Sequence, residues 1–438
     1  MNIPNYVCHI MKILEENNFQ AYLVGGGTRD NFLNREAKDY DVATSATPQQ
    51  VKQLFDKVIP TGEKHGTVTV LIRENSVEVT TLRKDGIYED YRHPTEVFFT
   101  DNLKEDLARR DFTINALAVD LNGKVYDYFG GLEDLKKGEI KAVGEPNDRF
   151  KEDPLRMMRA IRFACQLDFY INIYTLISIS TNSELINKIS AERIRDELCK
   201  ILLSNYPEFG IRALLDTNIL KYIIPELCEC NNFDQYNIHH DKNVFDHIME
   251  VLSNTPNILN VRLAALLHDI AKPKTFTLDK NNQGHFYGHH IDGAEIAEEI
   301  LRRLKFDNKT IEAVKILVFE HMSRYDFLRV ASIKKFINRV GIENLNNLFE
   351  LQIADIKGSA SPHDFNKVIE LREKVEEILT KEEPLTVKNL AINGHDLIDL
   401  GFTPGIEMGN ILKYLLERVL ENPELNTKDN LKSMVIKI

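Results

Sequence analysis

The spacing of hydrophobic residues changes once along this chain, and that change constrains the fold more than any other feature. Up to about Val143 the apolar residues come in short β-branched runs such as AYLVGG, TVTVLI and SVEVTTL, separated by Gly, Asn and Asp. From about Arg149 onward they recur three and four apart over long stretches, which is the period of amphipathic helices. The pattern predicts an α+β fold, with an N-terminal head around a small mixed β-sheet followed by all-α domains.

Length allows several domains. The 438 residues correspond to two to four domains at roughly 100 to 200 residues each. Two polar segments, CECNNFDQYNIHHDKN and SASPHD, interrupt the helical pattern. We therefore expect a head over residues 1–145, a helical neck over 146–235, a body over 236–362 and a helical tail over 363–438.

Charge and cysteine content restrict the partners and the location. With 55 Lys and Arg against 67 Asp and Glu, the net charge is -12, so a nucleic-acid site must be a local patch rather than the whole surface. Residues 136–162 form such a patch, with eight basic and five acidic residues and thus a net charge of +3. The five cysteines form no CxxC pair, and no run reaches the ~18 apolar residues of a membrane span. We expect a cytoplasmic monomer or homodimer with no membrane association.

The segment LVGGGTRDNFLNREAKDYDVAT combines a glycine-rich turn with two carboxylates. On the expected strand Asp39 and Asp41 share one face, and adjacent carboxylates repel unless a cation such as Mg²⁺ lies between them. The glycines allow backbone N–H groups to approach phosphate oxygens. Glu78 alternates with Val77 and Val79 and offers a third carboxylate. Each signal alone is commonly a turn, a solvated loop or an exposed strand residue, but together they indicate nucleotidyl transfer.

The segment KEDPLRMMRAIRF places one acidic and three basic residues three apart on an expected helix: Asp153, Arg156, Arg159 and Arg162. An Asp accepts from an exocyclic amine and an Arg donates to a ring acceptor. Cytosine and adenine both present that combination, whereas uracil and guanine present the reverse order. An Asp153 and Arg156 pair would therefore select C and A without a template. The alternative is an ordinary surface salt bridge.

A second set of possible metal ligands lies between residues 244 and 358: His247, His268, Asp269, His289, His321 and Asp355. In LAALLHDIAKP an apolar stripe is interrupted by adjacent His and Asp, which is costly to bury unless a metal compensates. Mixed imidazole and carboxylate ligands suit Ni, Co, Mn, Fe, Zn or Mg. His290 is adjacent to His289 and is the alternative ligand.

Several segments in order resemble the class II tRNA nucleotidyltransferases, the bacterial CCA-adding enzymes: LVGGGTRDNFLNREAKDYDVAT, PTGEKHGTVTV, VEVTTLRKDGIYEDYRHPTEVFF, DLARRDFTINALA and FKEDPLRMMRAIRFA. The resemblance covers nearly the whole chain. It implies a catalytic head, a neck that recognises the incoming nucleotide, and body and tail helices that hold tRNA. The implied reaction adds C, C and A to the 3′ end of tRNA from CTP and ATP. The later His and Asp set resembles the two-metal HD phosphohydrolases, which implies an additional hydrolase.

The resemblance also implies residue roles. Asp39 and Asp41 match the Mg²⁺ ligands, with Glu78 as the third carboxylate. The positions matching nucleotide-binding residues are Gly26, Gly27, Arg29, Arg109, Arg110, Asp111, Asn115, Asp153, Arg156, Arg159 and Arg162, and those around Asp111 are associated with the ribose. The loop RKDGIYEDYRHPTEV is expected to be mobile, and in this family such a loop accompanies addition of the terminal A.

Three other functions remain open. An A-adding tRNA nucleotidyltransferase or poly(A) polymerase shares the head motifs. The HD domain could be the principal activity, acting as a phosphatase or cyclic phosphodiesterase, with the head only binding RNA. A pure tRNA-binding protein is disfavoured because two complete sets of catalytic residue types are present.

Overall fold

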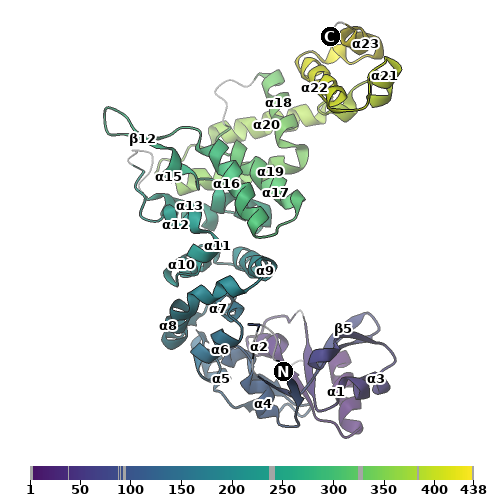
Figure 1. The fold of residues 1–438 in the computed structure, drawn as a ribbon, viewed down its shortest axis with the longest axis vertical. Helices are drawn as coiled ribbons and strands as arrows, with labels where there is room; N and C mark the ends of the chain where they lie inside the picture. Colours follow the sequence, from purple (N-terminus) through teal and green to yellow (C-terminus); the bar gives the residue numbers. More distant parts are fainter. Residues whose placement is uncertain are drawn as a thin grey trace. The chain divides into compact units, whose positions relative to one another are not determined.

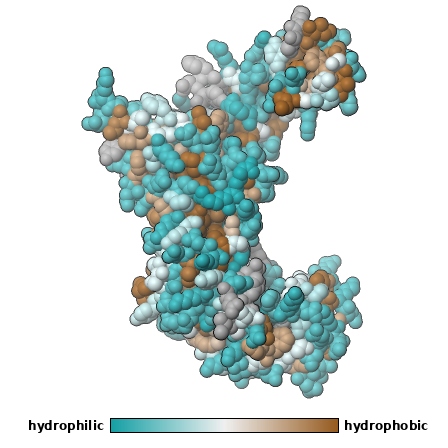
Figure 2. Space-filling model, viewed as in Figure 1, coloured by the Kyte–Doolittle hydropathy of each residue, from teal (hydrophilic) through white to brown (hydrophobic). Residues whose placement is uncertain are grey.

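The computed structural model describes residues 3–37, 39–86, 88, 90–91, 95–235, 242–323, 329–381 and 384–436. The chain divides into two compact units, Met1–Pro225 and Glu226–Ile438 (Figure 1). The finer division into four domains, with boundaries after residues 145, 235 and 362, stays a prediction. The face of the molecule drawn in Figure 2 is mostly hydrophilic, since most large apolar side chains are buried.

The first unit begins with the predicted mixed sheet. Within the described residues it has seven strands in the order β3-β4-β5-β2-β1-β8-β9. Strands β2 and β5 are parallel, and the other neighbouring pairs are antiparallel. The strands are β1 (Ala21–Val24), β2 (Asp41–Thr44), β3 (Val58–Gly62), β4 (Thr67–Ile72), β5 (Asn75–Thr81), β8 (Leu117–Val119) and β9 (Val125–Asp127).

Both faces of this sheet are covered. Helix α1 (Asn5–Glu16) buries Val7, Ile10, Met11 and Leu14, a spacing that places them on one side of a helix. They pack with α3 (Pro48–Leu54) and with alternate strand residues in one apolar cluster. Residues of α4 (Leu103–Ala108) join a second cluster with strand residues that point the other way. The strands are thereby fixed in place, while Asp41 at the start of β2 and Glu78 within β5 belong to neither apolar cluster.

The predicted neck is mostly helical. Its helices are α6 (Pro146–Glu152), α7 (Leu155–Leu167), α8 (Ile173–Asn182), α9 (Ala191–Leu202), α10 (Pro207–Asp216), α11 (Leu220–Ile223) and α12 (Pro225–Glu229), and α5 (Gly131–Lys137) precedes them at the end of the predicted head. The all-α prediction misses one short parallel pair, β10 (Glu139–Ile140) with β11 (Tyr170–Ile171). Helix α7 packs against both α9 and α10, so the Arg-rich segment is anchored by helices that come later in the chain.

The second unit is built around α14 (Leu259–Leu267), whose residues 261–267 are all buried. It packs against α13 (Val244–Ser253), α17 (Asn308–Glu320) and α19 (Ile342–Gly358), while α16 (His289–Arg303) packs on α17. The remaining helices are α15 (Lys272–Thr275), α18 (Val330–Val340), α20 (Asn366–Thr380), α21 (Gly394–Asp399), α22 (Ile406–Glu421) and α23 (Lys428–Val435).

Two observations complete the second unit and the chain. The all-α prediction for the body overlooks a hairpin of β12 (Phe276–Leu278) and β13 (Gly284–Phe286), because three-residue strands leave little periodic signal. None of the helices in the described part of the chain combines the length and apolar character needed to cross a bilayer.

Candidate active site and metal centre

The glycine-rich segment forms the start of a helix rather than a turn before one. Helix α2 (Gly25–Phe32) begins directly after β1. Gly25 has a φ of 74°, and a Cβ there would lie 2.6 Å from Asp41 Oδ2. A Cβ at Gly27 would lie 2.8 Å from the backbone oxygen of Asp39. Both glycines therefore allow the helix to approach the two acidic residues closely.

The three predicted catalytic carboxylates come from two neighbouring strands and one loop. Asp41 is the first residue of β2 and lies opposite Glu78 of β5 in the parallel register. Val77 and Val79 are buried while Glu78 is exposed, as the alternation predicts. Asp39 lies before the strand and not on it, so the predicted two-residue alternation of Asp39 and Asp41 is wrong.

Burial raises the pKa of Asp41 to about 6. Arg110 opposes this rise, whereas Glu78 and Asp39 add to it, since like charges nearby disfavour ionisation. A divalent cation would relieve the repulsion, and three carboxylates are the hard oxygen ligands that Mg²⁺ prefers. These residue types suit the predicted Mg²⁺, and its binding here stays a prediction.

A cavity of about 1030 Å³ collects the predicted nucleotide-binding residues. It is lined by Asp39, Asp41 and all of the residues predicted to bind nucleotide: Gly26, Gly27, Arg29, Arg109, Arg110, Asp111, Asn115, Asp153, Arg156, Arg159 and Arg162. Glu78 lines a smaller cavity of about 210 Å³ that shares Asp41, Arg109 and Arg110 with the larger one. The tertiary structure thus brings these residues together, while their individual roles stay predictions.

A chain of hydrogen bonds orders the arginines of this cavity. Arg29 Nη1 donates to Asn115 Oδ1 at 2.9 Å, and Asn115 Nδ2 donates to Asp111 Oδ1 at 3.1 Å. Arg159 donates to Asp111 Oδ2 through Nε and Nη2 at 2.9 and 2.5 Å. Burial alone would raise the pKa of Asp111, but Arg159 and Asn115 more than offset it and hold that pKa well below its usual value. The ionised Asp111 fixes the orientation of Arg159.

One aromatic residue organises three cations, and sequence reasoning missed it. The guanidinium carbons of Arg29, Arg159 and Arg162 lie 5.0, 5.5 and 4.2 Å from the centroid of the Phe163 ring. Arg162 also pairs with Glu197 at 3.0 Å. Cation–π contacts and this ion pair reduce repulsion among the three cations. The sequence pattern that could have identified Phe163 is its position four residues after Arg159 on α7.

Asp153 and Arg156 line the same cavity but do not lie on one helix. Asp153 ends α6 in an extended conformation, and α7 starts at Leu155. The reason is Pro154, because the residue before a proline disfavours the helical conformation. Asp153 Oδ1 accepts from the Leu155 N–H, the first N–H of α7, at 3.1 Å.

Each member of this pair has its own support. Arg193 of α9 donates to Asp153 Oδ1 and Oδ2 at 3.2 and 2.8 Å. Arg156 donates to Glu152 Oε2 at 2.6 Å and to the backbone oxygen of Arg109 at 3.0 Å. Sequence reasoning assigned no role to Arg193. The partner of Asp153 lies 40 residues away in the chain, so no local pattern reveals it.

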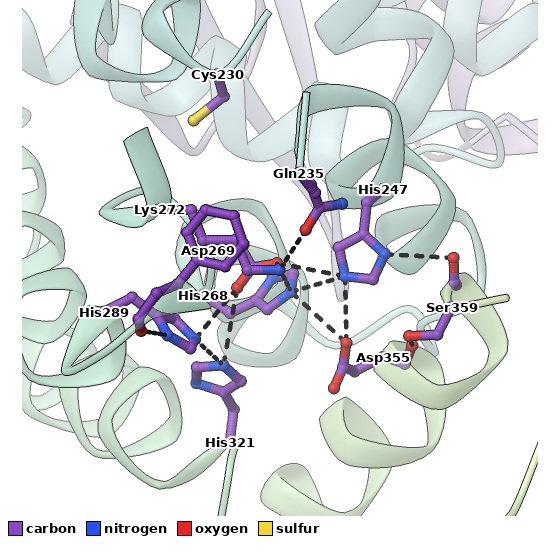
Figure 3. Close-up of polar contacts among 12 residues, drawn as sticks. Cys230, Gln235, His247, His268, Asp269, Lys272, His289, His321, Asp355 and Ser359 are labelled. Carbon is purple, nitrogen blue, oxygen red and sulfur yellow. Dashed lines mark hydrogen bonds and ion pairs between the residues drawn. The ribbon is translucent and has the colours of Figure 1, made fainter. Parts of the chain in front are cut away.

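The predicted ligands of the second unit form two adjacent clusters (Figure 3). One cluster contains His247, His268 and Asp355, and the other contains Asp269, His289 and His321. Each predicted ligand is buried. The structure places His289 in a cluster, while His290 packs 5.6 Å from the ring of Phe319.

All four clustered histidines have the same orientation. Their Nδ1 atoms lie 2.6 to 3.2 Å from backbone carbonyl oxygens. This arrangement fixes the tautomer and turns Nε2 toward the cluster, as metal-ligating histidines do. The Nε2 atoms of His247 and His268 are 3.4 Å apart, and those of His289 and His321 are 3.3 Å apart. Burial lowers the pKa of His321 to about 3, so it stays neutral and able to bind a metal.

Asp269 connects the two clusters. Its Oδ2 lies 3.4 and 3.2 Å from Nε2 of His247 and His268, and its Oδ1 lies 3.5 Å from Nε2 of His289. One carboxylate oxygen therefore faces the histidines of each cluster, so Asp269 could offer a ligand atom to a metal in either one. Asp269 Oδ2 is buried and also lies 2.7 Å from Lys272 Nζ. The donor set fits two divalent metals and does not distinguish among Ni, Co, Mn, Fe, Zn and Mg.

A buried lysine beside this centre was also missed. Lys272 Nζ lies 2.7 Å from Asp269 Oδ2, donates to Gln235 Oε1 at 2.7 Å and lies 5.2 Å from the ring centroid of Phe286. Lys272 lines a cavity of about 500 Å³ together with Asp269, His289, His321 and Asp355. The sequence pattern that could have identified Lys272 is its position three residues after Asp269, on the same side of the turn.

Comparison with known proteins is consistent with this geometry. Residues 21–141 match the family described as "Poly A polymerase head domain", residues 168–230 match "Probable RNA and SrmB- binding site of polymerase A", and residues 238–356 match "HD domain". The fold and the two sites thus define a nucleotidyltransferase head joined to an HD domain.

Curated relatives make the family more specific. The chain is 35% identical to the CCA-adding enzyme of Ligilactobacillus salivarius, over 98% of this chain and 96% of that protein. It is also 35% identical to the CCA-adding enzyme of Lactobacillus helveticus, over 96% and 94%. The crystal structure of the Bacillus stearothermophilus CCA-adding enzyme in complex with CTP superposes with a TM-score of 0.72 and 27% identity, covering 100% of this chain and 98% of that one. The chain belongs to the CCA-adding enzyme family of class II tRNA nucleotidyltransferases, which confirms the resemblance found in the sequence.

Proposed function

We propose that this chain completes the 3′ end of tRNA by adding C, C and A from CTP and ATP, without a nucleic-acid template. Family membership supports the reaction, and the Bacillus stearothermophilus relative forms a complex with CTP. The observation that carries the proposal is the register of β2 and β5. It sets Asp41 opposite Glu78, at the edge of a cavity that also holds Asp39 and six arginines predicted to bind nucleotide.

In the proposed reaction, the tRNA 3′ oxygen bonds to the α-phosphorus of the incoming nucleotide. The bond from that phosphorus to the bridging oxygen breaks, and pyrophosphate leaves. Asp39 and Asp41, with Glu78 as the third carboxylate, would hold two Mg²⁺ ions, one of which would acidify the attacking hydroxyl while the other would neutralise phosphate charge. Arg29 and Arg110 bind the triphosphate, because guanidinium forks match phosphate oxygens.

Asp153 and Arg156 select the base. The carboxylate accepts from the exocyclic amine of cytosine or adenine, and the guanidinium donates to the adjacent ring acceptor. Uracil and guanine place an N–H toward Arg156 and a carbonyl toward Asp153, which leaves both protein groups unsatisfied. Arg193 supports this selection by holding both oxygens of Asp153.

Incorporation of labelled CMP into tRNA lacking CCA tests the head. Asp39→Ala is expected to abolish incorporation, whereas the exposed control Asp101→Ala keeps it. Wild-type activity in Asp39→Ala would refute the assignment. Supplying CTP alone or ATP alone, with tRNAs ending in the discriminator base, C or CC, separates the alternatives. Addition of AMP without prior CMP would identify an A-adding enzyme or poly(A) polymerase.

The loop RKDGIYEDYRHPTEV bears on addition of the terminal A. Its ends pair as β6 (Arg83–Asp85) and β7 (Val97–Phe99), while residues 87, 89 and 92–94 lie outside the described residues. The proposed mobility of this segment therefore stays a prediction. The nucleotide-omission assay on tRNA ending in CC measures the function directly.

A second activity is favoured by the position of Asp269 between the two clusters. We propose that the HD centre hydrolyses phosphoesters with two divalent metals held by its six ligands. Such a pair supplies Lewis-acid activation of water and substrate. Nickel-dependent hydrolysis of cyclic 2′,3′-AMP should be lost in Asp269→Ala and retained in Asp292→Ala, an exposed control on α16. Equal rates in Asp269→Ala and wild type would remove the hydrolase proposal.

A cytoplasmic location is also proposed, since none of the five cysteines forms a disulfide.

A further inference from the structure

The cavity beside the HD centre extends well beyond the metal ligands. Its volume of about 500 Å³ falls within the range of small-molecule sites, about 300 to 1000 Å³. Asp269, His289, His321 and Asp355 form one part of its wall, and residues from the segments 284–287 and 359–364 form much of the remainder. The cavity therefore has room for a ligand larger than a phosphoryl group, and the residues away from the metal ligands decide which ligand fits.

The hairpin of β12 and β13 ends in a stacked pair of aromatic rings at this cavity. The rings of His285 and Tyr287 lie 5.3 Å apart with an interplanar angle of 11°, and both residues line the cavity. His285 Nε2 lies 3.4 Å from Asp279 Oδ2, which orients the imidazole. Tyr287 is 75% exposed, although aromatic side chains normally bury much of their area. With His285 on one face of the tyrosine ring, the opposite face is left for a ligand.

The backbone around Tyr287 is held from two directions. The preceding residue, Phe286, packs with its ring centroid 5.6 Å from that of Phe276 on the paired strand. The backbone oxygen of Phe286 also lies 2.7 Å from Nδ1 of His289, a predicted metal ligand. One turn thus orients a metal ligand and presents an exposed tyrosine ring to the same cavity. This arrangement is that of a site which binds one group at the metals and a second, flat group nearby.

The charges of the cavity favour a ligand with a single phosphate. Among the described residues that line it, Lys272 is the only Lys or Arg. The nucleotide cavity of the first unit is instead lined by eight arginines, which suits the several phosphate oxygens of a triphosphate. A monophosphate or cyclic phosphate carries less charge, which the proposed metals and Lys272 can neutralise. The two cavities therefore suit different phosphate compounds.

We propose that Tyr287, supported by His285, is the residue through which the HD cavity recognises the base of a nucleoside monophosphate. The base stacks on the exposed face of the tyrosine ring, and the phosphate reaches the two clusters of metal ligands. Because every base has a π-face, such stacking selects nucleosides as a class over phosphoesters without a ring. The position of the phosphate rests on the proposed hydrolase, whereas the stacking can be measured without catalysis.

The fluorescence of a single tryptophan tests the stacking. The chain contains no Trp, so Tyr287→Trp introduces the only one and keeps an aromatic ring at this position. In full-length protein supplied with Mg²⁺ or Zn²⁺, 3′-AMP is expected to quench this fluorescence at least twofold, whereas β-glycerophosphate leaves it unchanged. The matched control is Tyr414→Trp, at an exposed tyrosine of the same unit that does not line the cavity. Equal responses of the two variants to 3′-AMP would overturn the proposal.

Hydrolysis by variants of Tyr287 separates this proposal from the hydrolase itself. In Tyr287→Ala, kcat/KM for cyclic 2′,3′-AMP should fall roughly 5- to 150-fold, the loss expected for one stacked base. Tyr287→Phe keeps the ring and should retain the wild-type value. Glycerol cyclic phosphate has the same ester without a base, so its hydrolysis should be equal in wild type and Tyr287→Ala.

Each other outcome contradicts one of the two proposals. An equal loss for both substrates in Tyr287→Ala, or no loss for either, overturns the role of Tyr287 and leaves the hydrolase in place. Quenching of Tyr287→Trp by 3′-AMP, together with no hydrolysis of either substrate by the wild type, refutes the hydrolase and retains the base site.

Discussion

Arg193 offers the sharpest test of how this chain reads a base, because it contacts the base-selecting carboxylate and no proposed catalytic carboxylate. The substitution is Arg193→Gln. It keeps much of the side-chain length but removes the charge and the two parallel donors to Asp153. Asp153 then keeps only its bond from the Leu155 N–H among those the structure shows.

The expected magnitude follows from the geometry. A carboxylate has about four acceptor positions. Arg193 and Leu155 occupy three of them, so the remaining one is directed and can face the exocyclic amine of the nucleotide. When Arg193 no longer orients the free acceptor position of Asp153, stabilisation of the transition state should fall by about 1.5 to 3 kcal/mol. This is the range for hydrogen bonds to charged groups. The corresponding fall in kcat/KM is roughly 10- to 150-fold for both CTP and ATP.

Stability should change much less than catalysis. The Arg193 and Asp153 side chains remain 22% and 16% exposed, and solvent-screened ion pairs contribute up to about 1 kcal/mol. For a unit of this size, that corresponds to a fall in melting temperature of about 2 to 4 °C. A selective loss of catalysis would therefore report on positioning rather than on folding.

Single-turnover incorporation of each of the four nucleotides measures the effect. Arg193→Gln should lose discrimination against UTP and GTP along with its rate for CTP and ATP. The matched control is Arg195→Gln on the same helix, since Arg195 pairs with Asp196 and does not line the cavity. Rates and discrimination within twofold of wild type in Arg193→Gln would refute the reasoning, as would an equal loss in Arg195→Gln.

Three further predictions concern the other parts of the molecule. Gly25→Ala would place a Cβ 2.6 Å from Asp41 Oδ2 and should reduce CMP incorporation at least 100-fold; Gly123→Ala has the same positive φ with no atom within 4 Å, and equal activity of the two variants would contradict the argument. Asp269→Asn should lose bound divalent metal by mass spectrometry while CMP incorporation stays within twofold of wild type, and retained metal would contradict its role as a ligand. The pKa of Asp111 is depressed in the folded state, so its stabilisation is complete above the unfolded value near 3.9 and is lost as pH falls below it. Thermal melts between pH 5 and pH 3 should therefore decline less in Asp111→Asn than in the wild type, and parallel curves would contradict this.

Structural features that depend only on neighbouring residues could be predicted from the sequence. The alternation of Val77, Glu78 and Val79 shows which side chain leaves the core, since strand side chains alternate strictly. The amphipathic spacing of α1 and the apolar run before His268 likewise depend on local periodicity. His268 and Asp269 were identifiable because His and Asp in an apolar stripe are costly without a metal, and the other four ligands because their order resembles that of the HD phosphohydrolases.

The predictions of where a helix or a strand begins were wrong at two positions, where one local sequence rule opposes another. Asp153 and Arg156 follow the spacing of one helix, but Pro154 restricts the residue before it and begins a new helix there. Asp39 and Asp41 follow the alternation of a strand, but the strand starts only at Asp41. Element boundaries depend on a few hydrogen bonds at each end, and those bonds are decided by neighbours that a short window of sequence does not contain.

The sequence by itself determined the kinds of chemical group this protein uses, the α+β order of its elements and its family, because these depend on residue identity and short-range periodicity. Only the tertiary structure decided that Glu78 lies opposite Asp41, that Arg193 holds Asp153 and that the two oxygens of Asp269 face histidines of different clusters. Each of these is a contact between distant segments. Such contacts result from packing the whole unit, in which one register or rotation satisfies all buried groups together, and no single segment contains that information.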